Sequence, residues 1–245
     1  MRKLVIALLF VCGSAAASTP GGFGLTVVVG VEPRPEYPAR GAVYVEAVRG
    51  ASYSLRLTNP MPYRVAVALS VDGLNTIDAR HTDAWSAAKW VLDPYESTVI
   101  SGWQVNDQTA RRFFFTGEQH SYGSRLGQTE NLGVIEAVFY RERPRPARQR
   151  FAPREKEDSR MPAPSSSSSA GALSDDYAAT GMGGRTAHEV ERVAIELDPH
   201  PAASVRIRYE FRPELMRLGV LPERENPLDR RERARGFGGY CPEPR

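Results

Sequence analysis

The segment Tyr63-Arg-Val-Ala-Val-Ala-Leu-Ser-Val-Asp72 decides the fold class. Large apolar side chains occupy every second position from Tyr63 to Val71, and small or polar residues stand between them. Successive side chains of a β-strand point to opposite faces of a sheet, so this period of two predicts a strand with one face against a core. The Asp-Gly dipeptide that follows is typical of a tight turn.

Similar short segments, separated by turn residues, continue on both sides of this strand. The predicted strands are 25–31, 43–49, 53–58, 63–71, 90–92, 98–103, 112–116 and 133–140. The proline-rich segments 33–38 and 59–62 predict loops between them. Short strands at such spacing are typical of a sandwich or barrel. We therefore expect an all-β fold, an antiparallel β-sandwich of jelly-roll or Ig-like type.

The first residues have the pattern of a secretory signal peptide. Arg2 and Lys3 precede an apolar run from Leu4 to Cys12, and the small residues 13–17 resemble a cleavage site. A membrane-spanning helix needs about 20 apolar residues, and this run is shorter. We therefore expect residues 1–17 to be removed, leaving a bacterial protein that is periplasmic or secreted and has no transmembrane segment.

Charge and cysteine content restrict the function classes further. Loss of Arg2 and Lys3 lowers the formal net charge from +3 to +1, so no overall field favours nucleic acid, and we expect no nucleic-acid partner. Cys12 lies in the predicted signal peptide and Cys241 near the C-terminus. The mature chain would therefore hold one cysteine and no internal disulfide, and the state of Cys241 stays open.

Composition changes abruptly after Tyr140. Residues 143–186 are rich in arginine, proline and serine and have few side chains that can pack, which predicts a disordered insert. Its basic part could contact an anionic surface, but the acidic residues Glu155, Glu157 and Asp158 favour a solvated linker. Alternation returns at Val193–Leu197 and Val205–Phe211, which predicts a hairpin.

A lone hairpin is marginal in water, so these strands are expected to complete the earlier sheets. This predicts one split sandwich domain formed by residues 24–142 and 187–220. The segment Pro213–Gly219 predicts a short helical turn that closes the domain. Residues 221–245 are charged and rich in proline and glycine, which predicts a disordered tail.

Candidate metal and cofactor residues are few. Asp72, Asn75 and Asp78 could offer oxygen ligands to Ca²⁺, but their spacing does not match an EF-hand loop, and tight turns favour the same residue types. The four histidines have no spacing typical of zinc ligands. The Gly181–Gly184 run is not placed between a strand and a helix, as a phosphate-binding loop would be. We predict no metal site, no cofactor site and no cofactor.

Catalytic signals are equally weak. His120 and Ser121 are residue types of a catalytic triad, but Ser121 lies on no Gly-x-Ser-x-Gly elbow. Exposed aromatic rings could stack on a sugar, which makes the loops near Trp85, His120 and Tyr122 an alternative site for a carbohydrate-binding module or hydrolase. Core packing explains most of the aromatic residues. We therefore predict no catalytic residues and a protein that is not an enzyme.

Several short motifs resemble those of a family of uncharacterised secreted bacterial β-rich envelope proteins. They are Leu69-Ser-Val-Asp-Gly-Leu-Asn75, Val91-Leu-Asp-Pro94, Ile100-Ser-Gly-Trp103, Ser121-Tyr122 and Gly133-Val-Ile135. The resemblance covers residues 53–140 and 189–220. It implies an exported β-rich domain of the bacterial envelope, and it implies no activity, ligand or site residue.

The leading hypothesis is an exported, non-enzymatic sandwich that binds a protein or an envelope component. Besides the carbohydrate-binding or hydrolytic alternative, a structural envelope or appendage subunit is a third possibility. The partner and the oligomeric state do not follow from the sequence.

Overall fold

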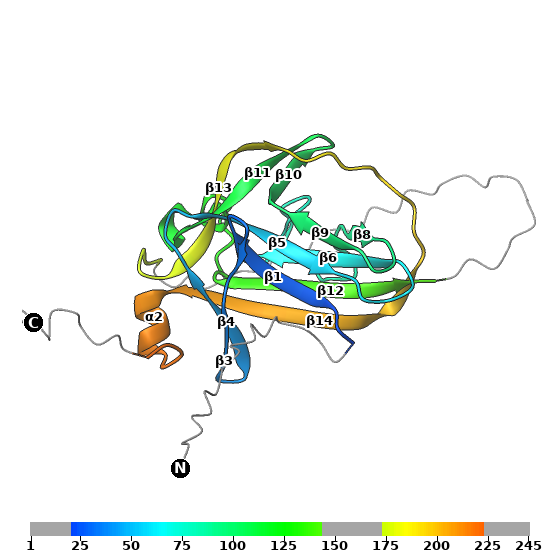
Figure 1. Ribbon diagram of the computed structural model, residues 1–245. Helices are drawn as coiled ribbons and strands as arrows, with labels where there is room; N and C mark the ends of the chain where they lie inside the picture. The colour runs from blue at the N-terminus through cyan, green and yellow to red at the C-terminus, as the bar shows by residue number, and fades with distance from the viewer. Residues whose placement is uncertain (1–20, 144–172, 223–245) are drawn as a thin grey trace, which may run out of the picture.

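The computed structural model describes residues 21–143 and 173–222, which form two packed β-sheets of seven strands each (Figure 1). The predicted all-β sandwich is therefore confirmed. The predicted signal peptide and Cys241 lie outside the described residues, as do residues 144–172 of the predicted insert and 223–245 of the predicted tail. No helix in residues 21–143 or 173–222 has the length and hydropathy needed to cross a bilayer.

Sheet I has the order β10-β11-β5-β1-β2, with β13 paired to β11 and β9 paired to β5. Its strands are β1 (Gly24–Val29), β2 (Glu32–Pro33), β5 (Ser52–Thr58), β9 (Ser97–Ile100), β10 (Gly102–Asn106), β11 (Thr109–Gly117) and β13 (Ala178–Ala187).

Sheet II has the order β3-β4-β14-β12-β6-β7, with β8 paired to β6. Its strands are β3 (Glu36–Ala39), β4 (Ala42–Ala47), β6 (Val65–Val71), β7 (Leu74–Asn75), β8 (Trp90–Leu92), β12 (Val134–Glu142) and β14 (Leu197–Phe211). The pairing of β4 with β14 is parallel, an exception to the antiparallel arrangement expected from the sequence.

The core lies between the inner faces of the two sheets. In β6 the alternating residues Val65, Val67, Leu69 and Val71 are fully buried, as their period predicts. Leucines of β1 and β5 and aromatic rings of β11 and β14 face them within the same cluster. Removing this apolar surface from water stabilises the fold by roughly 25 cal/mol per Å². The two sheets are thus held together mainly by apolar packing.

Strand β13 corrects the predicted limits of the insert, because part of the segment expected to be disordered forms an ordered strand. The sequence did not reveal β13, because its glycines interrupt the alternation of apolar residues. Gly181 pairs with Phe114 of β11, and a Cβ at Gly181 would lie 2.3 Å from the Phe114 ring. The aromatic cover at Gly181 therefore comes from the neighbouring strand, while the buried side chains that β13 supplies, such as Ala178, Ala179 and Thr180, are small.

The predicted hairpin at 193–211 is wrong. Residues 191–196 form no strand, and β14 is a single strand of 15 residues that includes Pro199 and Pro201. These prolines lie where the register with β12 is irregular and before the part that pairs with β4. Proline is tolerated there because fewer ladder hydrogen bonds need its missing N–H. Pro33 and Pro38, expected in a loop, likewise lie in the outermost strands β2 and β3.

The helices are short. A 3₁₀ turn η1 (Glu118–His120) and helix α1 (Tyr122–Arg125) connect β11 to β12. Helix α2 (Arg212–Arg217) confirms the predicted closing turn, and Gly219 after it has a φ of 70°. Leu221, expected in the tail, is buried with Tyr44 and Leu215. The ordered domain thus extends slightly past its predicted end.

Gly102 is required by the close approach of two strands. A Cβ at this position would lie 2.0 Å from the backbone oxygen of Arg111. We expect Gly102→Ala to lower the free energy of unfolding by about 1–3 kcal/mol, because the backbone of β10 or β11 must shift. Urea unfolding followed by tryptophan fluorescence measures this loss. Gly184→Ala is the matched control, since no atom lies within 4 Å of its Cβ position. An equal loss in both variants would contradict the explanation.

Candidate functional site

The segment of residues 188–196, called the strap here, connects β13 to β14 and passes outside the sandwich (Figure 1). At its first end the His188 N–H donates to the Gln108 oxygen over 3.0 Å, and the Val190 N–H donates to the Asp107 oxygen over 2.9 Å. At its other end the Arg143 N–H donates to the Glu196 oxygen over 2.8 Å. Within the described residues, the backbone of residues 191–195 makes no hydrogen bond to other backbone. The strap is therefore fixed at both ends and unpaired in its middle.

Beneath the strap, both sheets end in strands with an open side. In the described parts of the chain β8 pairs only with β6, and β9 pairs only with β5. Each therefore keeps one edge with backbone N–H and C=O groups that no neighbouring strand uses. A groove of about 890 Å³ extends between these strands and the strap, and we call it the strap groove.

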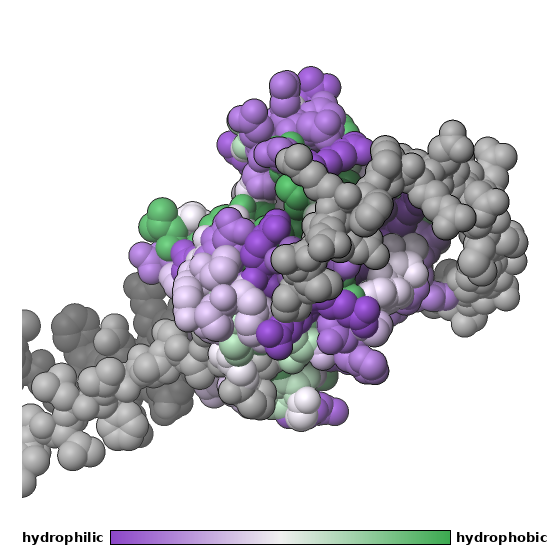
Figure 2. All heavy atoms as spheres, turned by 90° about the vertical axis from the view of Figure 1, so that its right-hand side faces the viewer, coloured by the Kyte–Doolittle hydropathy of each residue, from purple (hydrophilic) through white to green (hydrophobic). Residues whose placement is uncertain are grey.

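Apolar side chains line much of the strap groove. Trp90 and Val91 of β8 and Ile100 of β9 belong to its wall. Val105 and Val193 also line it and are 57% and 47% exposed. Figure 2 views this side of the molecule and shows hydrophobic residues set among hydrophilic ones. The groove thus offers an apolar surface with a polar rim.

The charged residues of the strap groove are mostly acidic. The acidic members are Asp78, Asp93, Glu96, Asp107, Glu189 and Glu191, and the basic members are Arg64, Lys89 and Arg192. Two of the cations are already paired, because Arg64 lies 3.1 Å from Asp93 and Arg192 lies 3.5 Å from Asp107.

The Lys89 ammonium donates hydrogen bonds to the backbone oxygens of Trp85 and Ala87. Burial lowers the pKa of His188, so this ring is neutral at neutral pH. The groove therefore carries a net negative charge.

The structure does not gather the predicted cluster of Trp85, His120 and Tyr122. Trp85 packs edge-on against Tyr140, with ring centroids 5.4 Å apart. Tyr122 packs against Trp103 of β10, with centroids 5.0 Å apart. None of the three residues lines the strap groove. Trp85 lies in the loop between β7 and β8, whereas His120 and Tyr122 both lie in the connection from β11 to β12, and each of the three has different contacts.

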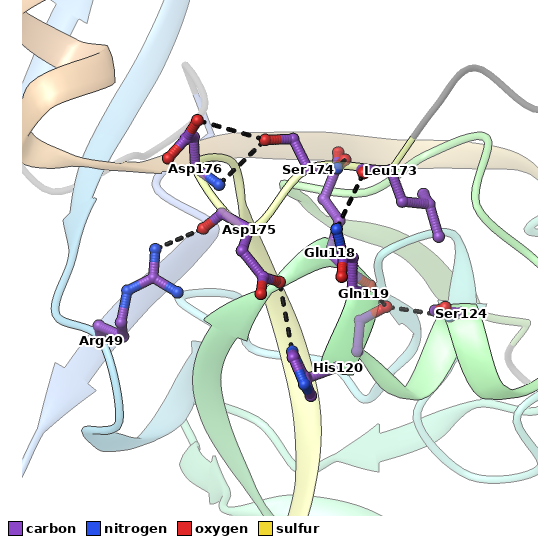
Figure 3. Close-up of polar contacts among 10 residues, drawn as sticks. Arg49, Glu118, Gln119, His120, Ser124, Leu173, Ser174, Asp175 and Asp176 are labelled. Carbon is purple, nitrogen blue, oxygen red and sulfur yellow. Dashed lines mark hydrogen bonds and ion pairs between the residues drawn. The ribbon is translucent and has the colours of Figure 1, made fainter.

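His120 does find an acidic partner, which the sequence did not indicate. Its Nδ1 lies 3.2 Å from Oδ1 of Asp175, in the turn that leads into β13 (Figure 3). The Ser121 hydroxyl instead donates to the Glu118 oxygen over 2.7 Å and accepts from the Ser124 N–H over 2.9 Å. Its hydroxyl caps α1, so these residues do not form the nucleophile and base contact of a triad.

Asp72 and Gly73 form the two-residue turn between β6 and β7, with φ values of 53° and 75°. Positive φ at both positions is the requirement of a type I′ hairpin, so the turn interpretation is confirmed. The Asp72 carboxylate has a further role. It accepts from the Gly133 N–H over 2.9 Å, from the Thr180 N–H over 2.7 Å and from the Tyr209 hydroxyl over 2.5 Å.

These contacts continue into a buried chain of hydroxyl groups. The Thr180 hydroxyl lies 2.7 Å from that of Tyr209 and 2.7 Å from that of Tyr53. Thr180 and Tyr53 belong to sheet I, and Tyr209 belongs to sheet II. Burial raises the pKa of the Asp72 carboxyl to about 7, although the hydrogen bonds that it accepts lower it. These hydrogen bonds link the two sheets. Because Asp72 is only 2% exposed, its carboxyl cannot receive a ligand.

The other oxygen-bearing residues of this segment serve their own turns. Asn75 donates to the Ala88 oxygen over 2.8 Å, and its Oδ1 accepts from the Ile77 N–H over 2.8 Å. Asp78 accepts from the Arg80 N–H over 3.1 Å. Within residues 21–143 and 173–222, no group of three or more His, Cys, Asp or Glu side chains could hold a metal ion.

Comparison with family models, with curated proteins and with solved structures finds no match. The resemblance to secreted bacterial proteins therefore stays a prediction, and function must be argued from the geometry. The strap groove was missed by the sequence reasoning because it depends on which strand edges remain unpaired. The alternation at Val193 and Ile195 was the available signal, but it was interpreted as a strand.

Proposed function

We propose that this protein is an exported, non-enzymatic binding protein whose strap groove takes an extended, basic segment of a partner protein. The observation that carries the proposal is the pair of unpaired edges on β8 and β9 beneath the strap. An extended peptide can add to such an edge as a further strand, because its own backbone completes the hydrogen bonds.

The side chains of the strap groove support the same mode of binding. A strand added beside β8 or β9 places alternate residues toward the apolar lining on the core side, which includes Trp90 of β8 and Ile100 of β9. The opposite residues face the rim, where Glu189 and Glu191 have no cationic partner among the described residues. Alternating apolar and basic residues therefore complement the groove. Charge complementarity of this kind raises the association rate and selects partners.

The alternatives use other features. The carbohydrate-binding or hydrolytic alternative relied on Trp85, His120 and Tyr122, which come from two different loops and have different contacts. A structural subunit that assembles with copies of itself could use the same free edges. Light scattering measures the oligomeric state of the mature protein. A monomer at concentrations at which a basic peptide binds would favour a different protein as the partner over a second copy of this chain.

A peptide experiment tests the proposal. We expect the mature chain to bind a labelled peptide of about ten residues in which valine and arginine alternate, with a dissociation constant on the order of 10 μM. Replacing arginine by glutamate in the peptide should abolish binding. Fluorescence anisotropy measures the affinity, and hydrogen exchange should show added protection of β8 or β9.

Substitutions at the rim of the strap groove test where the peptide binds. Glu189→Gln with Glu191→Gln should weaken binding of the arginine peptide by about five- to tenfold at low salt, with a smaller effect at high salt. Glu130→Gln, at an exposed position remote from the groove lining, is the matched control. Binding of both peptides with equal affinity, or protection confined to other strands, would sink the proposal.

A further inference from the structure

A second pocket lies on the outer face of sheet II, away from the apolar core. Its volume is about 240 Å³, and loop 78–89 forms one of its sides. Small side chains of β6, Ala68 and Ser70, form part of its floor, and Ala84 and Ala87 of the loop are small as well. The pocket is therefore a consequence of small residues on two facing surfaces. We call it the outer pocket.

The loop beside the outer pocket is held in place by specific contacts. His81 Nδ1 lies 3.0 Å from the Gly73 oxygen, and Asn75 anchors the loop at the Ala88 oxygen. Asp83 accepts from the Trp85 N–H over 2.9 Å. These bonds keep the loop from collapsing onto the sheet. A ligand would meet a preformed site, which lowers the entropic cost of binding.

The charges around the outer pocket leave one cation in excess. Arg206 and Glu136 form an ion pair of 2.7 Å across β14 and β12. Arg208 lines the same pocket and has no ion pair or side-chain hydrogen bond within the described residues. His81 Nδ1 donates to the Gly73 oxygen, because a carbonyl oxygen can only accept, so Nε2 is the ring nitrogen that this bond leaves for other contacts. Ser70, Thr82 and Asn131 add neutral polar groups to the lining.

We propose that the outer pocket binds a small monocarboxylate that carries hydroxyl groups, a sugar acid being the chemical class that fits. The Arg208 guanidinium offers the planar pair of donors that a carboxylate accepts. The hydroxyl, amide and imidazole groups suit the hydroxyls of such a ligand. The volume is below the roughly 300–1,000 Å³ of sites for drug-sized molecules, which limits the ligand to about one ring.

Glu136 distinguishes between classes of anion. The single excess cation, Arg208, balances one negative charge, whereas a doubly charged phosphate brings a second charge close to the carboxylate of Glu136. This site is separate from the strap groove and does not depend on the proposed peptide binding.

Titration of the mature protein tests the inference, with ¹H–¹⁵N chemical shifts as the readout. D-glucuronate should bind with a dissociation constant on the order of 1 mM and shift amides of β6, β12 and β14. D-glucose, inorganic phosphate and sodium chloride are the comparison additions and should bind at least about tenfold more weakly.

Two variants test the residues. Arg208→Gln should weaken glucuronate binding by about tenfold or more, whereas Glu136→Gln should strengthen it several-fold because it removes the repelling charge and frees Arg206. Arg125→Gln, on the exposed end of α1, is the control and should leave the affinity unchanged. Equal binding of glucose, tighter binding of phosphate, or an affinity unaffected by Arg208→Gln would each overturn the inference. Unchanged melting temperatures verify that the variants are folded.

Discussion

Replacing Asp72 with alanine is expected to lower the free energy of unfolding by about 3–5 kcal/mol at about pH 5. Three buried donors lose their acceptor: the N–H groups of Gly133 and Thr180 and the hydroxyl of Tyr209. Each unsatisfied buried group costs about 1–3 kcal/mol. Alanine at a φ of 53° adds backbone strain, because only glycine and short polar residues adopt this region readily.

Chemical denaturation followed by tryptophan fluorescence measures this loss, since Trp103 is buried in the core. Asp72→Asn separates the two causes: asparagine tolerates the positive φ, and its amide keeps one acceptor oxygen beside a donor, as the protonated carboxyl does at this pH. It should therefore lose less stability than alanine. Asp107→Ala, at an exposed turn, is the matched control. A loss in Asp72→Ala no larger than in this control would show that the carboxylate does not link the sheets.

The stability of the domain is expected to fall as pH rises from about 4 to about 7, by about 4 kcal/mol through Asp72 alone. The folded pKa of Asp72 is raised from 3.8 to about 7, with burial as the largest cause. In this window the unfolded chain releases the proton while the folded chain keeps it, so the folded state binds more protons. The stabilisation is complete below the unfolded pKa and is lost as pH rises through the folded pKa.

Glu210 acts in the same direction. Burial is the main cause that raises the pKa of Glu210 to about 7, and the nearby charges of Glu214 and Glu118 add to it. The hydrogen bond that the Glu210 carboxylate accepts from the Ala178 N–H lowers this pKa. Urea denaturation at several pH values measures the dependence. Asp72→Asn should remove roughly half of the slope, and the remainder should follow Glu210. A wild-type protein whose stability rises between these pH values would contradict the assignment.

The strands that build the core were predictable because their own residues carry the signal. The alternation from Val65 to Val71 and the Asp72-Gly73 turn predicted β6 and its end, and both are confirmed. Strand β13 was not predictable in the same way. Its glycines carry no apolar period, and Phe114 on another strand supplies the cover.

The role of Asp72 and the strap groove depend on distant parts of the chain. The three donors to the Asp72 carboxylate come from residues 61, 108 and 137 positions away. The groove arises because no strand pairs with the outer edges of β8 and β9 within the described residues. Periodicity identifies strands but does not reveal which strands become neighbours. The prolines in β14 likewise looked like a turn because a local pattern does not show that the register is irregular there.

The position of β14 within sheet II has a consequence for the order in which the molecule can assemble. This strand lies between β4 and β12, so the middle of the sheet is supplied by the last strand of the described residues. During synthesis, residues of β4 and β12 appear long before their shared neighbour and expose two matching edges. The sheet cannot close until residues 197–211 have emerged. Such long-range pairing slows folding, and the polypeptide stays open for longer than a domain made of successive hairpins would.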